Sequence, residues 1–140
     1  MNVREVMTTN PRTVSPNDTI QIAARIMKEE DTGVVPVVDN GRAVGVVTDR
    51  DIVVRAVADG SQPNKPVREI ATIDIVCATP DMSTREATKI MSERQIRRLP
   101  VVEGDRLVGI VSLGDIAVKE GKDSRTGETL EQISEGVKKH

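Results

Sequence analysis

Two short segments of this 140-residue sequence carry the residue types best suited to binding chemistry. The first motif is Gly-Val-Val-Thr-Asp-Arg-Asp at residues 45–51, and the second motif is Gly-Ile-Val-Ser-Leu-Gly-Asp at residues 109–115. Where a strand passes into a helix, free backbone N–H groups and the positive end of the helix dipole suit a phosphate. The hydroxyl of Thr48 or Ser112 adds a donor to that phosphate, and the carboxylate of Asp51 or Asp115 can accept hydrogen bonds from both hydroxyls of a ribose.

The same spacing also has a purely structural interpretation. Thr48-x-x-Asp51 and Ser112-x-x-Asp115 both fit a helix capping box, with a hydroxyl at the N-cap and an acid in the first turn. Capping and ligand binding do not exclude each other, so the residue types alone leave both functions open.

The two motifs are copies within a duplicated sequence. Val-Arg-Glu-Val-Met-Thr from Val3 recurs as Val-Arg-Glu-Ile-Ala-Thr from Val67, and the same offset of 64 relates the two motifs without a gap. We therefore divide the chain into repeat 1 at residues 1–58, a linker at residues 59–66, repeat 2 at residues 67–120 and a polar tail. The tail, residues 121–140, is expected to be partly helical or frayed.

Each repeat predicts the element order β-α-β-β-α. Short extended stretches at residues 11–14 and 75–78 precede amphipathic helices, two Val-rich strands joined by a turn, and a second helix that begins at Asp49 or Leu113. In the first amphipathic helix Ile22 and Ile26 belong to the expected apolar stripe. The fold class is α+β (α/β-like), and we expect the two β-α-β-β-α repeats to pack about a pseudo-twofold axis, which buries both apolar sheet faces.

Composition excludes several classes of function. The absence of Phe, Tyr and Trp and the net charge of -2 argue against nucleic-acid binding, and no apolar run is long enough for a membrane span. One cysteine and no signal peptide favour a cytoplasmic location. The only histidine is His140, so we do not expect the protein to be an enzyme, and we expect no metal site and no required cofactor.

The combination of motifs resembles the CBS domain family. Its pieces are Thr-Val-Ser-Pro at residues 13–16, Leu-Pro-Val-Val at residues 99–102 and the paired motifs, and the resemblance covers residues 3–119. The pair resembles the tandem arrangement called a Bateman module, in its small stand-alone prokaryotic form. This resemblance implies a homodimer that binds AMP, ADP, ATP or a related adenosyl ligand in clefts between repeats. It also implies that Asp51 and Asp115 hold ribose and that Thr48 and Ser112 contact phosphate.

The resemblance implies further ligand contacts. Family members place a basic residue before the Leu-Pro-Val-Val strand, which here gives Arg97 and Arg98 as phosphate-binding residues. Repeat 1 departs from the pattern with Gly33 and Val34, so we expect the second site to be the better anion site. The remaining implied contacts form the adenine pocket: Thr13, Val14 and Pro36 in repeat 1, and Cys77, Ala78 and Pro100 in repeat 2.

The sequence thus predicts a non-catalytic regulatory module with an adenine nucleotide as its regulatory ligand. Binding would change the conformation, and an unknown effector protein would respond to that change. The alternative is a structural homodimer with a degenerate site, in which the two motifs act only as helix caps.

Overall fold

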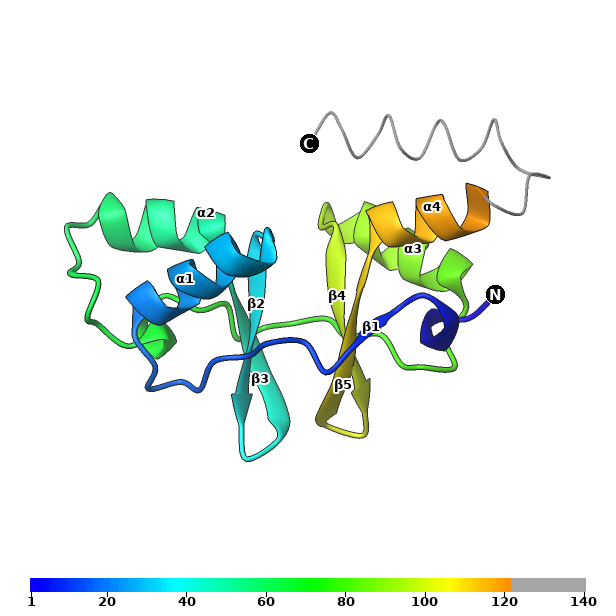
Figure 1. Ribbon diagram of the computed structural model, residues 1–140, viewed down its shortest axis with the longest axis horizontal. Coiled ribbons are helices and arrows are strands. Elements are labelled where there is room, and N and C mark those ends of the chain that lie inside the picture. Colours follow the sequence, from blue (N-terminus) through cyan, green and yellow to red (C-terminus); the bar gives the residue numbers. More distant parts are fainter. Residues whose placement is uncertain (122–140) are drawn as a thin grey trace. The chain divides into compact units, whose positions relative to one another are not determined.

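The computed structural model describes residues 1–121 and divides into two compact units (Figure 1). The first-motif unit contains Asn10–Val76 together with a hairpin tip, Gly104–Leu107. Among the described residues, the second-motif unit contains Met1–Thr9, Cys77–Glu103 and residues 108–121. Each unit therefore holds one complete motif.

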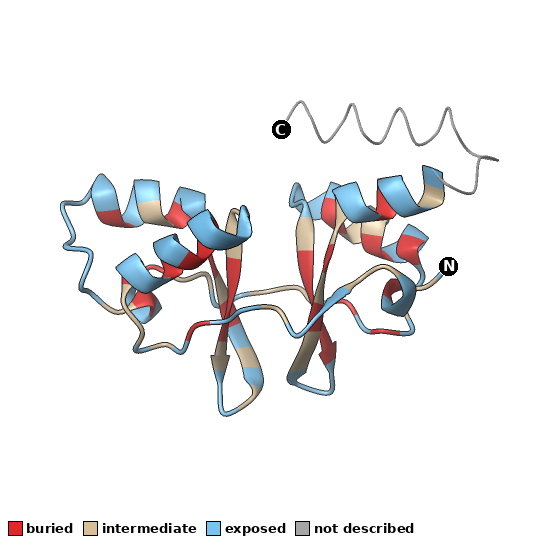
Figure 2. Ribbon diagram, in the orientation of Figure 1, coloured by how far each residue is buried: buried red, intermediate tan, exposed pale blue. Residues whose placement is uncertain are grey.

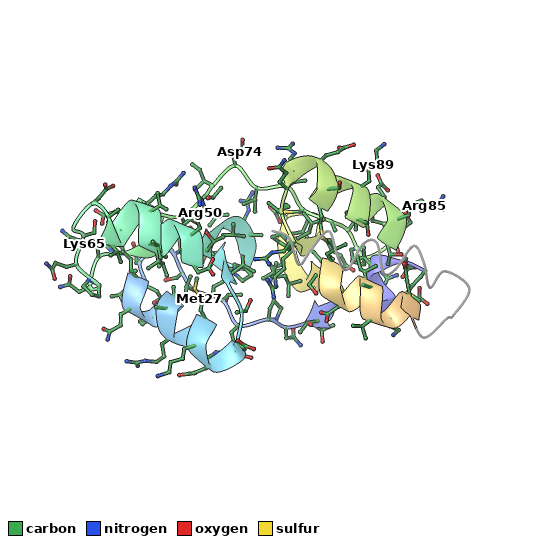
Figure 3. All side chains as sticks on the ribbon, turned by 90° about the horizontal axis from the view of Figure 1, so that it is seen from above. Met27, Arg50, Lys65, Asp74, Arg85 and Lys89 are labelled. Carbon is green, nitrogen blue, oxygen red and sulfur yellow. The ribbon has the colours of Figure 1, made fainter. Side chains whose placement is uncertain are left out.

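The first-motif unit is built from a hairpin and two helical segments. Helix α1 is Ile20–Glu30, strands β2 and β3 are Val34–Asp39 and Arg42–Thr48, and a three-residue α2, Asp49–Asp51, continues as the π-helical segment η2, Ile52–Val57. The 3-10 turn η3, Val67–Glu69, completes the unit. The two helical segments lie side by side next to the hairpin (Figure 1; Figure 3).

The second-motif unit contains a corresponding hairpin and a corresponding pair of helices. Helix α3 is Thr84–Arg94, strands β4 and β5 are Arg98–Glu103 and Arg106–Ser112, and helix α4 is Leu113–Gly121. Residues 1–9, which form the leading segment of repeat 1, also belong to this unit. They contribute the 3-10 turn η1, Val3–Glu5, and strand β1, Thr8–Thr9, which pairs antiparallel with β5.

Turn chemistry sets the β2–β3 register. Asn40 and Gly41 have φ angles of 53° and 82°, and left-handed backbone at both loop positions defines the type I′ turn that matches the twist of a hairpin. Pro36 lies opposite Val46, and Val37 lies opposite Gly45.

Aliphatic side chains make the core of the first-motif unit (Figure 2). Ile20, Ala23 and Ile26 of α1 pack with Val35 and Val37 of β2, and burial of each larger side chain stabilises the fold by roughly 1.5–3 kcal/mol. In the view from above, Met27 lies between the two helical segments (Figure 3).

The apolar stripe of α1 differs from its prediction at one position. Ile22 is 40% exposed, whereas Ile20 is 4% exposed. The reason is helical geometry, because Ile20, Ala23 and Met27 follow one another at spacings of three and four residues and take the face that meets the hairpin.

The leading segment of each repeat packs in the unit of the other repeat. Val3 N donates to Met82 O at 2.8 Å in the second-motif unit, and Val67 N donates to Asp18 O at 2.8 Å in the first-motif unit. Val3 and Val67 are both fully buried. The sequence repeats and the compact units are therefore two different divisions of this chain.

The predicted mixed α+β fold class is confirmed, and the predicted helices and hairpins lie close to the observed elements. The tail at residues 122–140 lies outside the described residues. Across residues 1–121, none of the helices is both long enough and apolar enough to span a membrane.

Candidate functional site

The first motif forms a closed capping box. Asp51 N donates to Thr48 Oγ1 at 3.0 Å, and Thr48 N donates to Asp51 Oδ2 at 3.0 Å. The strand β3 ends at Thr48 and the helical segment begins at the next residue, so two backbone donors at this junction are bonded without a ligand.

Two further side chains approach the carboxylate of Asp51. Thr72 Oγ1 lies 3.5 Å from both carboxylate oxygens, and Arg55 Nε lies 3.9 Å from Oδ1. Asp51 is only 9% exposed. The carboxylate at the first motif is therefore engaged by its own unit from three sides.

The second motif is capped in one direction only. Asp115 N donates to Ser112 Oγ at 3.0 Å, as at the first motif. Asp115 is exposed, and within residues 1–121 its carboxylate accepts no hydrogen bond and forms no ion pair. The equivalent of Thr72 is Thr8 of β1, and the equivalent of Arg55 is Lys119, whose Nζ donates to Glu5 O at 2.7 Å. Among the described residues, the carboxylate at the second motif thus lacks the partners that engage its first-motif equivalent.

The residues before the buried strands also differ between the copies. Leu113 N donates to Arg97 O at 2.9 Å, and Asp49 N donates to Gly33 O at the same distance. Arg97 is exposed and Arg98 is half-buried, and this backbone hydrogen bond places the first of the two arginines beside the junction where the second motif begins its helix. At the first motif the corresponding residues are Gly33 and Val34, which carry no charge.

The residues predicted to surround adenine lie beside the same strands. Val14 N donates to Pro36 O at 3.0 Å and Val38 N donates to Val14 O at 2.8 Å, which places residues 13 and 14 alongside β2. Ala78 N donates to Pro100 O at 2.8 Å and Val102 N donates to Ala78 O at 2.9 Å, which places residues 77 and 78 alongside β4.

The exposure of these residues alternates. Thr13 is exposed and Val14 is buried, whereas Cys77 is half-buried and Ala78 is buried. Burial raises the pKa of the Cys77 thiol, which keeps the sulfur protonated and apolar at neutral pH. Each set of predicted site residues therefore lies within one unit, Thr13, Val14, Pro36, Thr48 and Asp51 in the first, and Cys77, Ala78, Arg97, Arg98, Pro100, Ser112 and Asp115 in the second.

Sequence reasoning missed Thr72, Arg55 and Asp49 at the first motif. Arg55 follows Asp51 by four residues, which is a recognisable helical ion-pair spacing. Thr72 carried no such signal, because it reaches Asp51 only through the exchange of leading segments.

No group of three His, Cys, Asp or Glu side chains within residues 1–121 has an arrangement that could hold a metal ion. His140 lies outside this range.

Comparison with known proteins gives one consistent family. The family model of the CBS domain matches residues 3–57 and 67–119. The chain is 45% identical to CBS domain-containing protein YhcV of Bacillus subtilis over 133 residues, which is 95% of each protein.

Solved structures agree with this fold. Hypoxic Response Protein I, crystallised with two coordinated zinc ions, has a TM-score of 0.78 at 37% identity, covering 84% of this chain and 97% of that one. The CBS domain pair of protein MJ0100, in complex with 5′-methylthioadenosine and S-adenosyl-L-methionine, has a TM-score of 0.78 at 32% identity, covering 88% of this chain and 98% of that one.

Proposed function

This chain belongs to the CBS domain family, and from that premise we propose that it is a regulatory module that binds an adenine nucleotide or a related adenosyl ligand and has no catalytic site. The observation that carries the proposal is the exposed carboxylate of Asp115, which has no protein partner within residues 1–121. A carboxylate in the first turn of a helix ordinarily closes a capping box, as Asp51 does. An acid left free at the same position suits the vicinal hydroxyls of a ribose.

In the second-motif unit we assign each part of the ligand to a residue. Asp115 accepts from the ribose hydroxyls, Ser112 donates to the nearest phosphate, and Arg97 and Arg98 bind the phosphate charge. The adenine ring lies against Pro100 and the segment Cys77-Ala78, whose apolar character suits an uncharged base.

In the first-motif unit the corresponding contacts come from Asp51 and Thr48, with Thr13, Val14 and Pro36 around the base. A ligand must here replace the bond that Asp51 accepts from Thr48 N and displace Thr72 from the carboxylate. We therefore propose that this site is the weaker of the two. The engaged capping box is also the one observation that favours a structural function, and it does so only at the first motif.

Regulation requires a second state and a responding protein. A ligand shifts a conformational equilibrium only by its difference in affinity for the two states, and an effector protein then binds one of them. We also propose a homodimer, because exposed valines lie on the outer faces of the motif helices: Val53, Val54 and Val57 on η2 and Val118 on α4. Ile116 and Ala117, by contrast, point into the core of their own unit.

Titration calorimetry with AMP, ATP and S-adenosylmethionine tests the proposal. We expect saturable binding by the wild type and at least about tenfold weaker binding of AMP and ATP by Asp115→Ala, because a hydrogen bond to a charged group contributes about 1.5–3 kcal/mol. Asp74→Ala removes an equally exposed carboxylate elsewhere and serves as the matched control (Figure 3). If the wild type binds none of the three ligands at millimolar concentration, the proposal fails in favour of the alternative, a structural homodimer with a degenerate site.

A further inference from the structure

The two copies differ at the position where a phosphate would be bound. Gly33 and Arg97 are equivalent in sequence, and the carbonyl oxygen of each accepts a hydrogen bond at 2.9 Å from the first residue of the following helical segment, Asp49 or Leu113. The two positions are therefore equivalent in backbone structure as well, and the difference between them lies only in the side chains.

At the first motif a carboxylate occupies the space next to this position. A Cβ atom added to Gly33 would lie 3.0 Å from Asp49 Oδ2 and 3.3 Å from Oδ1. Asp49 Oδ1 is held there by the N–H of Arg50 at 2.8 Å. Where the second copy begins an arginine side chain, the first copy thus places a negative charge.

The charged side chains at these equivalent positions give the two copies net charges of opposite sign. Residues 33, 34 and 49–51 carry Asp49, Arg50 and Asp51, for a net charge of -1. Residues 97, 98 and 113–115 carry two arginines and one aspartate, for a net charge of +1. Arg55 and Lys119 add one positive charge to each copy and leave the difference unchanged.

We propose that Asp49 makes the first-motif site selective for adenosyl ligands without phosphate groups, neutral or with a cationic side chain, while the second-motif site takes phosphorylated ones. This inference rests on the proposed function. Its physical basis is that a carboxylate repels a phosphate dianion and attracts an ammonium or sulfonium group, whereas the paired arginines do the reverse. One chain then responds to two classes of adenosyl compound through two sites of the same fold.

Asp115→Ala weakens the second-motif site, so binding to this variant reports on the first-motif site. The experiment measures binding of AMP, adenosine and S-adenosylmethionine to this variant at low salt. We expect adenosine and S-adenosylmethionine to bind more tightly than AMP. Adding Asp49→Leu, which copies Leu113, should tighten AMP binding by at least about threefold and leave adenosine binding unchanged, since removal of an exposed negative charge relieves its repulsion of the phosphate alone. The gain should disappear at about 1 M salt, where the screening length falls to about 3 Å.

The reciprocal substitution is the control for a change in packing. Leu113→Asp in the Asp51→Asn background should weaken AMP binding at the second site and spare adenosine. The inference is overturned if Asp115→Ala binds AMP more tightly than adenosine, if Asp49→Leu leaves their ratio unchanged, or if Asp115→Ala binds none of the three. Failure of the proposed function is distinct, because the wild type would then bind no adenosyl ligand at all.

Discussion

Replacing Asp51 by alanine should mainly lower the stability of the fold, whereas replacing Asp115 by alanine should mainly weaken ligand binding. Asp51→Ala removes the acceptor of the Thr48 N–H, leaves the Thr72 hydroxyl without its acceptor, and removes the negative charge beside Arg55. Loss of an N-terminal cap of this kind lowers the free energy of unfolding by about 1–2 kcal/mol. Asp115→Ala removes only the favourable position of an exposed carboxylate near the start of α4, which is about 0.5 kcal/mol or less.

Urea unfolding and thermal unfolding, each followed by far-ultraviolet circular dichroism, measure both variants, since the sequence offers no aromatic fluorophore. Asp51→Ala should lower the melting temperature by about 4–8 °C and Asp115→Ala by about 2 °C or less. Binding of AMP should show the opposite order, with the greater loss in Asp115→Ala.

Equal destabilisation by the two substitutions would refute the difference that we draw between an engaged and a free carboxylate. Thr48→Val and Ser112→Ala test whether the two motifs differ only at their carboxylates. Each removes an N-cap hydroxyl that accepts a bond at 3.0 Å, so both should destabilise the fold by similar amounts.

Three further outcomes are expected. Val57→Asp should convert a dimer to a monomer in light scattering without loss of helicity, while Ile73→Asp, at an equally exposed position, should leave the mass unchanged. The Arg12 guanidinium lowers the pKa of Glu29 below its ordinary 4.5, so the stability that this pair contributes is present above that pH and is lost as pH falls through the lowered pKa. Urea midpoints of the wild type and Arg12→Ala should therefore converge in acid. The raised pKa of the Cys77 thiol should make its alkylation at neutral pH slower than in the unfolded chain, and bound AMP should slow it further.

Local patterns were enough to predict the elements of this fold. The Asn40-Gly41 pair specifies a two-residue hairpin turn, and the valine-rich segments on each side of it are typical of strands. The placement of Ile22 failed because the helix offers two overlapping apolar stripes, and only the position of the hairpin decides which one is buried.

The residue types of the site were predictable from the sequence. Whether each aspartate carboxylate is already bonded within the protein was not. Both motifs carry a hydroxyl residue and an aspartate at the same spacing, so the sequence presents Asp51 and Asp115 as equals. Arg55 contributes to their difference at a helical spacing that the sequence shows, but Thr72 reaches the first carboxylate only through a contact set by the tertiary fold. A pattern of residues along the chain contains no such contact.

The exchange of leading segments has a consequence for any attempt to separate the two repeats. A fragment cut at the sequence boundary, residues 1–58, would contain Val3 without Met82, its hydrogen-bond partner, and would lack Val67, which fills the core of its own unit. Such a fragment could complete its fold by exchanging leading segments with the other repeat. In the intact chain the two repeats are tethered, so this exchange is an intramolecular closure and not a bimolecular encounter limited by protein concentration.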